Sequence, residues 1–309
     1  MSIIFLLVNI FSRALIAGTP LLLGTIGEIY SERSGILNLG IEGMMAVGAV
    51  SGFSVAQRTG NLWLGVLASG LAGLLLSLIH AFVTITLKAS QVISGLALSM
   101  FGLGLSGLIG KSFIGKPLQK SFVDFRVPFL SRIPFLGPIL FSKDAVFFIS
   151  ILLALLLWFI LYHSTLGLKI RSSGENPKAT DAMGINVYAI QYGCVLLGGF
   201  MAGLAGAYIS LAYSPTWIEG ITGGRGWIVI ALTILASWNP LKAFIGAYLF
   251  GGIYVIQYLL QSKGIPNNLL MMLPYLATLL VLVISSRQFI RRKMGAPASL
   301  GEPFIKGER

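Results

Sequence analysis

The chain has 309 residues, of which 56% are hydrophobic and 10% are charged, and its formal net charge is +12. A water-soluble domain of this length would expose far too much apolar surface, so the composition excludes a soluble protein and indicates an integral membrane protein. The basic residues are scattered over the segments between apolar runs, with one cluster near the C-terminus. This distribution favours a role in membrane orientation over binding to nucleic acid.

Apolar runs long enough to cross about 30 Å of hydrocarbon recur along the whole chain. They predict helices, because each membrane segment must satisfy its own backbone hydrogen bonds, and the sequence lacks the short alternating segments of a β-barrel. We predict an all-α polytopic transmembrane bundle of about eight to ten membrane helices, with one or more broken or re-entrant segments. The predicted spans are 3–27, 38–57, 62–87, 91–110, 144–162, 187–212, 226–238, 241–260 and 267–286.

The stretch "ERSGILNLGIEG", residues 32–43, places charge between two apolar runs. Glu28, Glu32 and Glu42, three of the ten acidic residues of the chain, lie in or beside it. A carboxylate in hydrocarbon costs several kcal/mol unless it pairs, meets water or accepts backbone hydrogen bonds, and Arg33 is the nearest possible partner. The stretch therefore requires a protein environment that compensates these charges.

Two interpretations of this stretch are equally supported by the residues alone. Its glycines tolerate a turn, and Asn38 can cap a helix or satisfy freed backbone groups, which favours a discontinuous helix that lines a cavity or packs against protein. The alternative is an ordinary cytoplasmic loop over 28–33, followed by a helix that buries Glu42 against a backbone donor.

An internal similarity links two apolar runs. "SGLAGLLLSL" at 69–78 and "AGLAGAYISL" at 202–211 match at six of ten positions. Many transporters consist of two related halves. Small residues at helix-packing spacing also recur by chance, so a true repeat and plain glycine packing both stay open.

No catalytic constellation or metal site is readable in the sequence. The glycines of "GLGLSG" at 102–107 imitate a dinucleotide fingerprint, and "GLSGLIGKS" imitates a phosphate loop, but no strand precedes them and Leu105 stands where that loop needs glycine. Close helix packing explains these glycines better. Cys194 fits a small core residue, and His80 and His163 are far apart, so we expect no metal site and no enzyme activity.

Two polar segments are long enough to have functions of their own. If the basic cluster "RQFIRRKMG" lies in the cytoplasm, counting the spans backward places 165–186 in the cytoplasm and 111–143 outside. We expect a transmembrane domain over 1–286 and a basic cytoplasmic tail over 287–309. Six bases then lie outside, against the positive-inside tendency: Lys111, Lys116, Lys120, Arg126, Arg132 and Lys143.

Within the second segment, "RSSGENPKATDAMGIN" predicts a short helix. Asn176 suits an N-cap, Pro177 suits the first turn, and Gly184 suits the C-terminal stop. A short amphipathic helix beside a membrane is generally an interfacial anchor or a docking element for a partner. Its weak apolar face favours docking and consists of Ala179, Ala182, Met183 and Ile185.

Five segments in order carry a family resemblance: "ERSGILNLGIEGMMAVGA", "QVISGLALSMFGLGLSG", "GENPKATDAMGIN", "GGFMAGLAGAYISL" and "GGRGWIVIALTILASWNP". Together they resemble the permease subunits of ABC importers in the branched-chain amino acid and simple-sugar permease family. The resemblance spans about residues 30–285, and it is closest to the smaller permease of bacterial nucleoside importers that depend on a BMP-type lipoprotein. Ser99, where relatives commonly have asparagine, and Thr180, where a second alanine is usual, depart from the pattern and affect the substrate assignment.

The resemblance implies one half of a translocation pathway in the bacterial cytoplasmic (inner) membrane. It implies three partner proteins: a second related permease, which favours a heterodimer over a homodimer, a cytoplasmic ABC ATPase and an extracytoplasmic substrate-binding lipoprotein. ATP and Mg²⁺ would be used by the ATPase, so this chain would bind no cofactor. The expected solute is a small polar molecule, foremost a nucleoside, with simple sugars or branched-chain amino acids as alternatives.

Two groups of candidate residues follow. Candidate substrate-pathway residues are Asn38, Gly40, Glu42, Gly43, Gln91, Ser94, Ser99 and Arg225. Residues expected to couple to the ATPase are Gly174, Glu175, Asn176, Pro177, Ala179, Asp181, Ala182, Met183, Gly184 and Ile185. Glu42 either contacts the solute or holds a broken helix in place, and Arg225 either meets a polar solute or extends to the membrane interface.

An ion-coupled secondary carrier is the alternative class of function. It would use Glu28, Glu32 or Glu42 as a proton or sodium site, and uptake driven by an ion gradient without an ATPase would favour it. A membrane-embedded enzyme is a third class, but it needs a catalytic constellation that the sequence does not contain.

Overall fold

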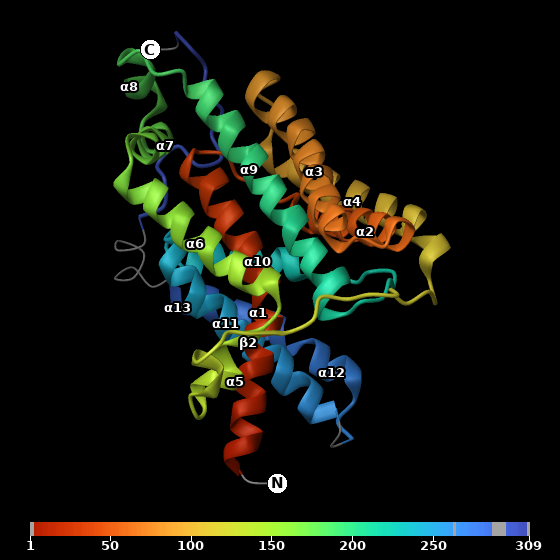
Figure 1. Ribbon diagram of the computed structural model, residues 1–309. Coiled ribbons are helices and arrows are strands. Elements are labelled where there is room, and N and C mark those ends of the chain that lie inside the picture. Colours follow the sequence, from red (N-terminus) through yellow and green to blue (C-terminus); the bar gives the residue numbers. More distant parts are fainter. Residues whose placement is uncertain (1–2, 262–263, 286–294, 308–309) are drawn as a thin grey trace.

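A computed structural model describes residues 3–261, 264–285 and 295–307. It is a helical bundle in which α1 (Ile3–Arg33) runs through the molecule (Figure 1). The strands in the described residues, β1 (Phe125–Arg126) and β2 (Ser142–Lys143), form one antiparallel pair. The predicted all-α class is confirmed.

The other helices follow in chain order. They are α2 (Ile41–Thr59), α3 (Leu62–Ala81), α4 (Gln91–Gly110), α5 (Leu136–Leu140), α6 (Ala145–His163), α7 (Thr165–Glu175), α8 (Pro177–Ala182), α9 (Val187–Tyr208), α10 (Arg225–Leu235), α11 (Pro240–Gln261), α12 (Asn267–Met271) and α13 (Leu273–Ser285). Short π-helical turns extend α3 over Phe82–Thr86 and α9 over Ile209–Tyr213. Single 3-10 turns cover Lys111–Phe113 and Leu130–Arg132.

Among the described residues, six helical stretches are long and apolar enough to cross a membrane. They are Leu7–Arg33, Leu62–Thr86, Gln91–Phe113, Ala145–His163, Val187–Tyr213 and Pro240–Gln261. Two shorter apolar helices, Arg225–Leu235 and Asn268–Val281, accompany them. A total of about eight to ten crossings stays a prediction, since the rest would have to come from these shorter helices and α2.

The first helix is longer than the predicted span 3–27, since it continues to Arg33. Glu28 and Glu32 are therefore helical and buried, and the interpretation of 28–33 as a cytoplasmic loop is wrong. The physical reason is that both carboxylates find donors inside the protein. Glu28 Oε1 accepts from the Asn38 N–H at 3.1 Å, and Glu32 Oε2 accepts from the Trp238 indole N–H. The break between two helices is confirmed at residues 34–40.

Glycines form the closest contacts among α2, α3 and α9. A Cβ at Gly48 on α2 would lie 2.7 Å from the Cα of Gly203 on α9. A Cβ at Gly203 would lie 2.1 Å from the carbonyl oxygen of Ser69 on α3. The helix backbones therefore touch, as in small-residue packing of membrane helices. The similar segments 69–78 and 202–211 contact each other here, which accounts for their glycines without deciding whether the chain contains a repeat.

We expect Gly203→Ala to destabilise the protein, because the added methyl group must displace the Ser69 carbonyl. Overpacking of this kind costs about 1–3 kcal/mol. Gly193→Ala on the same helix is the matched control, since nothing lies within 4 Å of a Cβ there. Melting temperatures in detergent, followed by fluorescence-detected size exclusion, compare the two variants. Equal melting temperatures would show that the contact between α3 and α9 tolerates a side chain.

The segment 111–143 contains β1, β2 and α5 and a cavity of about 910 Å³. Residues that line the cavity are Val123, Asp124, Arg126, Pro128, Phe129, Ser131, Arg132, Pro138 and Ser142. Lys143 is buried beside it and donates from Nζ to the carbonyl oxygen of Ser12 at 3.0 Å. Burial lowers the pKa of the Lys143 ammonium to about 8. Lys143, one of the six bases counted outside, is therefore not an exposed charge. This reduces the conflict with the positive-inside tendency.

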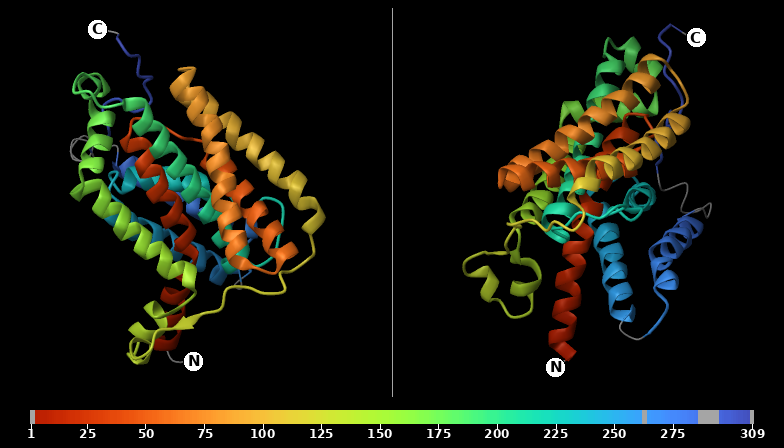
Figure 2. Two further views of the ribbon diagram at one scale, coloured as in Figure 1. Left: turned by 45° about the horizontal axis from the view of Figure 1, so that its top comes forward. Right: turned by 90° about the vertical axis from the view of Figure 1, so that its right-hand side faces the viewer.

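The two polar segments lie at opposite ends of the bundle. Figure 2 shows α8 and the C-terminal segment at one end, and the N-terminus with the helix of the 111–143 segment at the other. This arrangement agrees with the expectation that 165–186 and 111–143 face opposite sides of the membrane, and the identity of each side stays a prediction.

Candidate functional site

The α1–α2 break, residues 34–40, carries backbone groups that no helix satisfies, and inside a membrane such groups need other partners. Polar side chains from neighbouring helices supply them. The Leu37 N–H donates to Oε1 of Gln91 on α4 at 2.6 Å. Glu28 on α1 accepts from the Asn38 N–H, as described above. The two N–H groups in the middle of the break are thus satisfied.

The carbonyl oxygens of the break have donors as well. Ser99 Oγ on α4 donates to the Leu39 carbonyl at 2.7 Å, and Gln191 Nε2 on α9 donates to the Ser34 carbonyl at 3.3 Å. These side chains are buried, so water does not compete for the carbonyls. The break is therefore an ordered piece of backbone, held from at least two further helices.

His80 on α3 connects the break to α4. Its Nε2 lies 3.1 Å from the Leu37 carbonyl, and its Nδ1 lies 3.0 Å from the Ser94 hydroxyl. Since a carbonyl only accepts, Nε2 carries a proton and donates to Leu37. The buried histidine thus bridges the break and α4.

The structure brings most of the predicted pathway residues together at this break. Asn38 closes it locally, because its Oδ1 accepts from the Gly40 N–H at 2.9 Å. Gln91, Ser94 and Ser99 approach from α4 through the contacts given above. Sequence reasoning did not place two further buried side chains, His80 and Gln191, at the break, and it named Glu28 only as a costly charge and a possible ion site. In the sequence, His80 and Gln191 are each a single polar residue in an apolar helix. Such a pattern indicates a buried polar contact but does not identify the hydrogen-bond partner.

Glu42, in the first turn of α2, is buried and binds the beginning of α10. Its Oε1 accepts from the Thr222 hydroxyl at 2.5 Å and from the Gly224 N–H at 3.0 Å. Its Oε2 accepts from the Gly226 N–H at 2.6 Å. A carboxylate at a helix N-terminus satisfies orphan N–H groups and interacts favourably with the helix dipole. Glu42 therefore fixes α2 to α10.

Glycine allows this close approach on both sides of Glu42. A Cβ at Gly226 would lie 2.5 Å from the Glu42 Cα, and a Cβ at Gly43 would lie 2.5 Å from the Leu98 carbonyl oxygen on α4. The first turn of α2 is consequently packed between α10 and α4 with no space for larger residues. Gly43 lets α2 approach α4 this closely because it has no side chain.

Arg225, the first residue of α10, is 6% exposed and lies among aromatic rings. Its guanidinium carbon is 4.6 Å from the ring centroid of Tyr254 and 5.3 Å from that of Tyr213. One amino group donates to the carbonyl oxygens of Ile221 and Thr222 at 3.2 and 3.0 Å. Arg225 is thus inside the protein in this structure, stabilised by cation–π contacts.

The predicted helix of the 165–186 segment is confirmed as α8. Asn176 Oδ1 accepts from the Ala179 N–H at 3.0 Å, Pro177 occupies the first turn, and Gly184 has a φ of +78°. Ala182 and Met183 are exposed, and Met183 reaches 80%. The exposed apolar edge that favours docking is thus present. Thr180, the departure from the family pattern, is buried and donates to the Asn176 carbonyl at 2.9 Å.

A separate helix, α7, precedes α8 and was missing from the sequence prediction. Ser164 caps it by accepting from the Gly167 N–H at 3.1 Å. Gly174 and Glu175, which were assigned to the coupling group, form the end of α7 instead of the beginning of α8. The coupling residues therefore extend over a helix–helix corner at Asn176.

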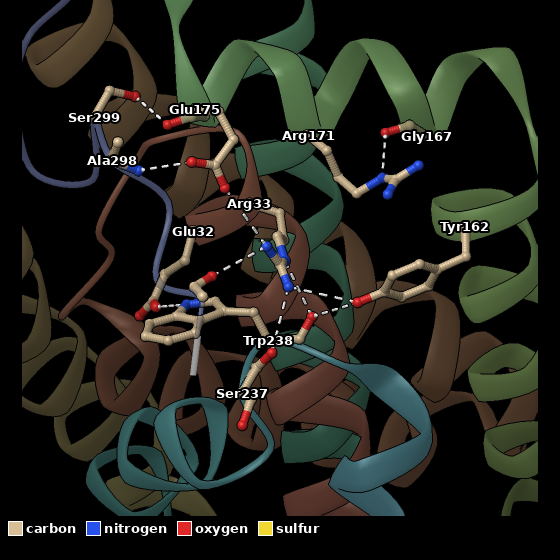
Figure 3. A network of polar contacts seen from close by, with 12 residues as sticks. Glu32, Arg33, Tyr162, Gly167, Arg171, Glu175, Ser237, Trp238, Ala298 and Ser299 are labelled. Carbon is tan, nitrogen blue, oxygen red and sulfur yellow. Dashed lines mark hydrogen bonds and ion pairs between the residues drawn. The ribbon is translucent and has the colours of Figure 1, made fainter. Parts of the chain in front are cut away.

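Arg33, the last residue of α1, joins this corner to the rest of the bundle (Figure 3). Its Nε donates to the Trp238 carbonyl at 3.2 Å, and its Nη2 donates to the Ser237 carbonyl at 3.3 Å. It also forms an ion pair of 4.0 Å with Glu175. Arg33 thus links the end of α1 with the α10–α11 connection and with α7, a set of contacts that the sequence did not reveal.

Residues 10–282 match the model of the protein family described as branched-chain amino acid transport system / permease component. The chain therefore belongs to this permease family. It is a multi-pass membrane protein and a component of a transporter, not an enzyme.

Three relatives are similar over nearly their full lengths. The putative glucose ABC transporter permease protein TsgC13 of Haloferax volcanii is 39% identical, covering 93% of this chain and 94% of the relative. The guanosine ABC transporter permease protein NupQ of Bacillus subtilis is 38% identical, and the nucleoside ABC transporter permease protein NupC of Lactococcus lactis is 34% identical, each over all of both chains. The chain is accordingly a permease subunit of the ABC transporter class, and the ion-coupled carrier is not supported.

A second guanosine permease of Bacillus subtilis also resembles this chain. The guanosine ABC transporter permease protein NupP of Bacillus subtilis is 24% identical to this chain over 90% of it and 81% of the relative. The two guanosine permeases of that organism, NupQ and NupP, thus both resemble this chain.

We expect Glu42→Ala to destabilise the protein, because the change leaves two N–H groups and one hydroxyl without their acceptor. The loss should reach about 3 kcal/mol or more, since hydrogen bonds to charged groups contribute about 1.5–3 kcal/mol each. Thr222→Val, which removes one donor and leaves both N–H contacts, is the matched control. Melting temperatures in detergent and uptake per folded molecule are measured together. An unchanged melting temperature for Glu42→Ala would contradict the holding role.

Proposed function

We propose that the chain forms one half of the translocation pathway of an ABC importer for nucleosides. The observation that supports the pathway most is the α1–α2 break, an interrupted membrane helix whose freed backbone groups bind buried polar side chains of α1, α3, α4 and α9. Backbone of this kind at membrane depth occurs where it lines a cavity or is buried in protein, and transporters use it beside their substrate sites.

Two polar donors of the proposed pathway support a solute with hydroxyl and carbonyl groups. Gln91 Nε2 and Arg225 Nε are buried and have no hydrogen-bond partner among the described residues. Each can donate to a ribose hydroxyl or to a base carbonyl of a nucleoside when the helices separate. The Tyr213 and Tyr254 rings beside Arg225 offer flat surfaces on which a base stacks.

A simple sugar is the second candidate solute. The observation in its favour is the 39% identity to a permease named for glucose, against 38% and 34% for the guanosine and nucleoside relatives. A sugar would use the same hydrogen-bond donors without the stacking contact. The two candidates therefore differ in whether an aromatic ring on the solute is required.

The proposed complex places this chain beside three partners in a bacterial cytoplasmic membrane. The related pair of guanosine permeases supports a second permease as the other half of the pathway. The exposed apolar edge of α8 supports docking of a cytoplasmic ATPase, which would use ATP and Mg²⁺ while this chain binds no cofactor. A substrate-binding lipoprotein would approach from the opposite end, where the 111–143 segment lies.

In this complex, ATP-driven closure of the ATPase would displace α8 and change which side the pathway faces. The displacement reaches the solute path because α8 follows α7, and α7 contacts the last turn of α1 through Arg33 and Glu175. The α1–α2 break then moves relative to α3 and α4, which hold it by hydrogen bonds of His80, Gln91 and Ser99.

The solute proposal predicts nucleoside uptake by the complete complex reconstituted in liposomes. Labelled guanosine should accumulate with ATP, and unlabelled adenosine should compete, because stacking on tyrosine tolerates different bases. Glucose and leucine in tenfold excess should leave guanosine uptake unchanged. ATP-dependent uptake of glucose, without competition by nucleosides, would overturn the nucleoside assignment and favour the sugar.

The docking proposal predicts that Met183→Asp weakens binding of the ATPase. A charge on the exposed apolar edge must be desolvated when the edge is buried, so co-purification of the ATPase should fall at least about tenfold. Met183→Leu keeps the apolar side chain and should bind normally. Ala189→Asp, an exposed position in the first turn of α9, is the control for added charge. Normal co-purification of Met183→Asp would contradict docking at α8.

A further inference from the structure

Residues 295–307, named here the C-terminal strap, pack against the coupling corner and do not form a separate tail. Ser299 donates from its N–H and from its hydroxyl to the Gly174 carbonyl, at 3.0 and 2.6 Å. The Ala298 N–H donates to Glu175 Oε2 at 3.4 Å. Figure 3 shows Ala298 and Ser299 beside Glu175 at the end of α7. The strap thus occupies the Gly174 carbonyl in the last turn of α7, where a helix leaves carbonyl groups without partners.

The other end of the strap contacts α8 and α9. Lys306 forms an ion pair of 3.5 Å with Asp181 on α8. Phe304 is buried, its ring centroid lies 5.3 Å from that of Tyr188, and its carbonyl accepts from the Tyr188 hydroxyl at 3.4 Å. The buried ring anchors the strap beside α8.

The middle of the strap contacts the α1–α2 break. The Gly301 N–H donates to the Gly35 carbonyl at 3.3 Å. At the beginning of the strap, the Gly295 carbonyl accepts from Nη1 of Arg33, the last residue of α1, at 3.3 Å. Gly35 has a φ of +96°, and a Cβ there would lie 2.8 Å from the Ser299 hydroxyl. The break and the strap are therefore in direct contact, at a position where both the backbone conformation and the available space require glycine.

The strap connects the α7–α8 corner with the α1–α2 break more firmly than the ion pair between Arg33 and Glu175 does. The ion pair between Arg33 and Glu175 spans 4.0 Å, and the Glu175 side chain is 52% exposed. Exposed ion pairs contribute little, typically about 0–1 kcal/mol. The strap adds backbone hydrogen bonds to Gly174 on one side and to Gly35 on the other, both beside the corner.

We propose that the C-terminal strap is a transmission element that makes the α7–α8 coupling corner and the α1–α2 break move as one body. Displacement of α8 by the ATPase then reaches the break through the strap as well as through α7. Loss of the strap contacts uncouples ATP hydrolysis from movement of the solute path. This inference rests on the proposed function, because it requires that an ATPase docks on α8.

The first test is the variant Ser299→Ala with Phe304→Ala, in the complete complex. The ATPase should still co-purify, since α8 keeps its exposed edge, and ATP should still be hydrolysed. The number of solute molecules taken up per ATP should fall at least about tenfold. Glu302→Ala is the matched control, because Glu302 is exposed on the same strap. The proposal uses no contact of the Glu302 side chain. An unchanged ratio of uptake to hydrolysis would overturn the proposal.

The second test fixes the strap to α8. Asp181→Cys and Lys306→Cys are joined by a short bis-maleimide, in a chain whose buried native cysteine is replaced by Cys194→Ala. Uptake per ATP by this substituted chain should be the same before and after cross-linking, because the proposal has both positions move together. Loss of uptake would overturn it and show that the strap must be released from α8. The cross-linking test decides whether the strap and α8 move together even if the Ser299→Ala, Phe304→Ala variant fails to assemble.

The two tests separate failure of the inference from failure of the proposed function. If the unmodified chain binds no ATPase and hydrolysis does not accompany uptake, the proposed function is wrong. If the unmodified complex couples hydrolysis to uptake and the strap variants do so equally well, the transmission role alone is wrong.

Discussion

An interrupted helix in a membrane leaves backbone N–H and C=O groups without partners, and the arrangement of this protein depends on how residues 34–40 satisfy them. The partners come from three helices, so the break fixes where α3, α4 and α9 stand relative to α1. An unsatisfied polar group in hydrocarbon costs several kcal/mol. The few polar side chains in these apolar helices are therefore structural requirements of the break, whatever they do for a solute.

The buried charges follow the same logic. Glu42 is tolerated because the N–H groups at the start of α10 need an acceptor as much as the carboxylate needs donors. Glu32 meets the Trp238 indole, and Arg33 meets two backbone carbonyls in the same connection between α10 and α11. Each charge thus joins the end of one helix to the end of another, which explains why charge is concentrated around residues 28–42.

The fold was predictable where it depends on local sequence. Apolar runs gave the helices, and Asn176, Pro177 and Gly184 gave the short helix α8 with its cap. The extension of α1 through Glu28 and Glu32 was not predictable, because it depends on the Asn38 N–H and on Trp238, which are distant in sequence or lie across a break. At the candidate site, Asn38 was named because of its position among the glycines of residues 32–43, and Gln91 belongs to a segment that carries the family resemblance. The hydrogen-bond partners His80 and Gln191 were not predictable, since a single polar residue in an apolar helix specifies no neighbour.

The end of α1 lies between the proposed solute path and the proposed docking site of the ATPase. Residues 34–40 border the proposed solute path on one side, through Gln91 and Ser99, and contact the strap on the other, through Gly35. Residues 34–40 thus contact both the proposed solute path and the docking end. No long series of intermediate residues is needed between the two, because a shift of the α7–α8 corner acts directly on the backbone of residues 34–40. Glycine at position 35 permits both contacts, since its positive φ turns the chain toward α2 while the missing side chain leaves space for Ser299. The break is thus the place where a small displacement at the docking end has the shortest route to the pathway.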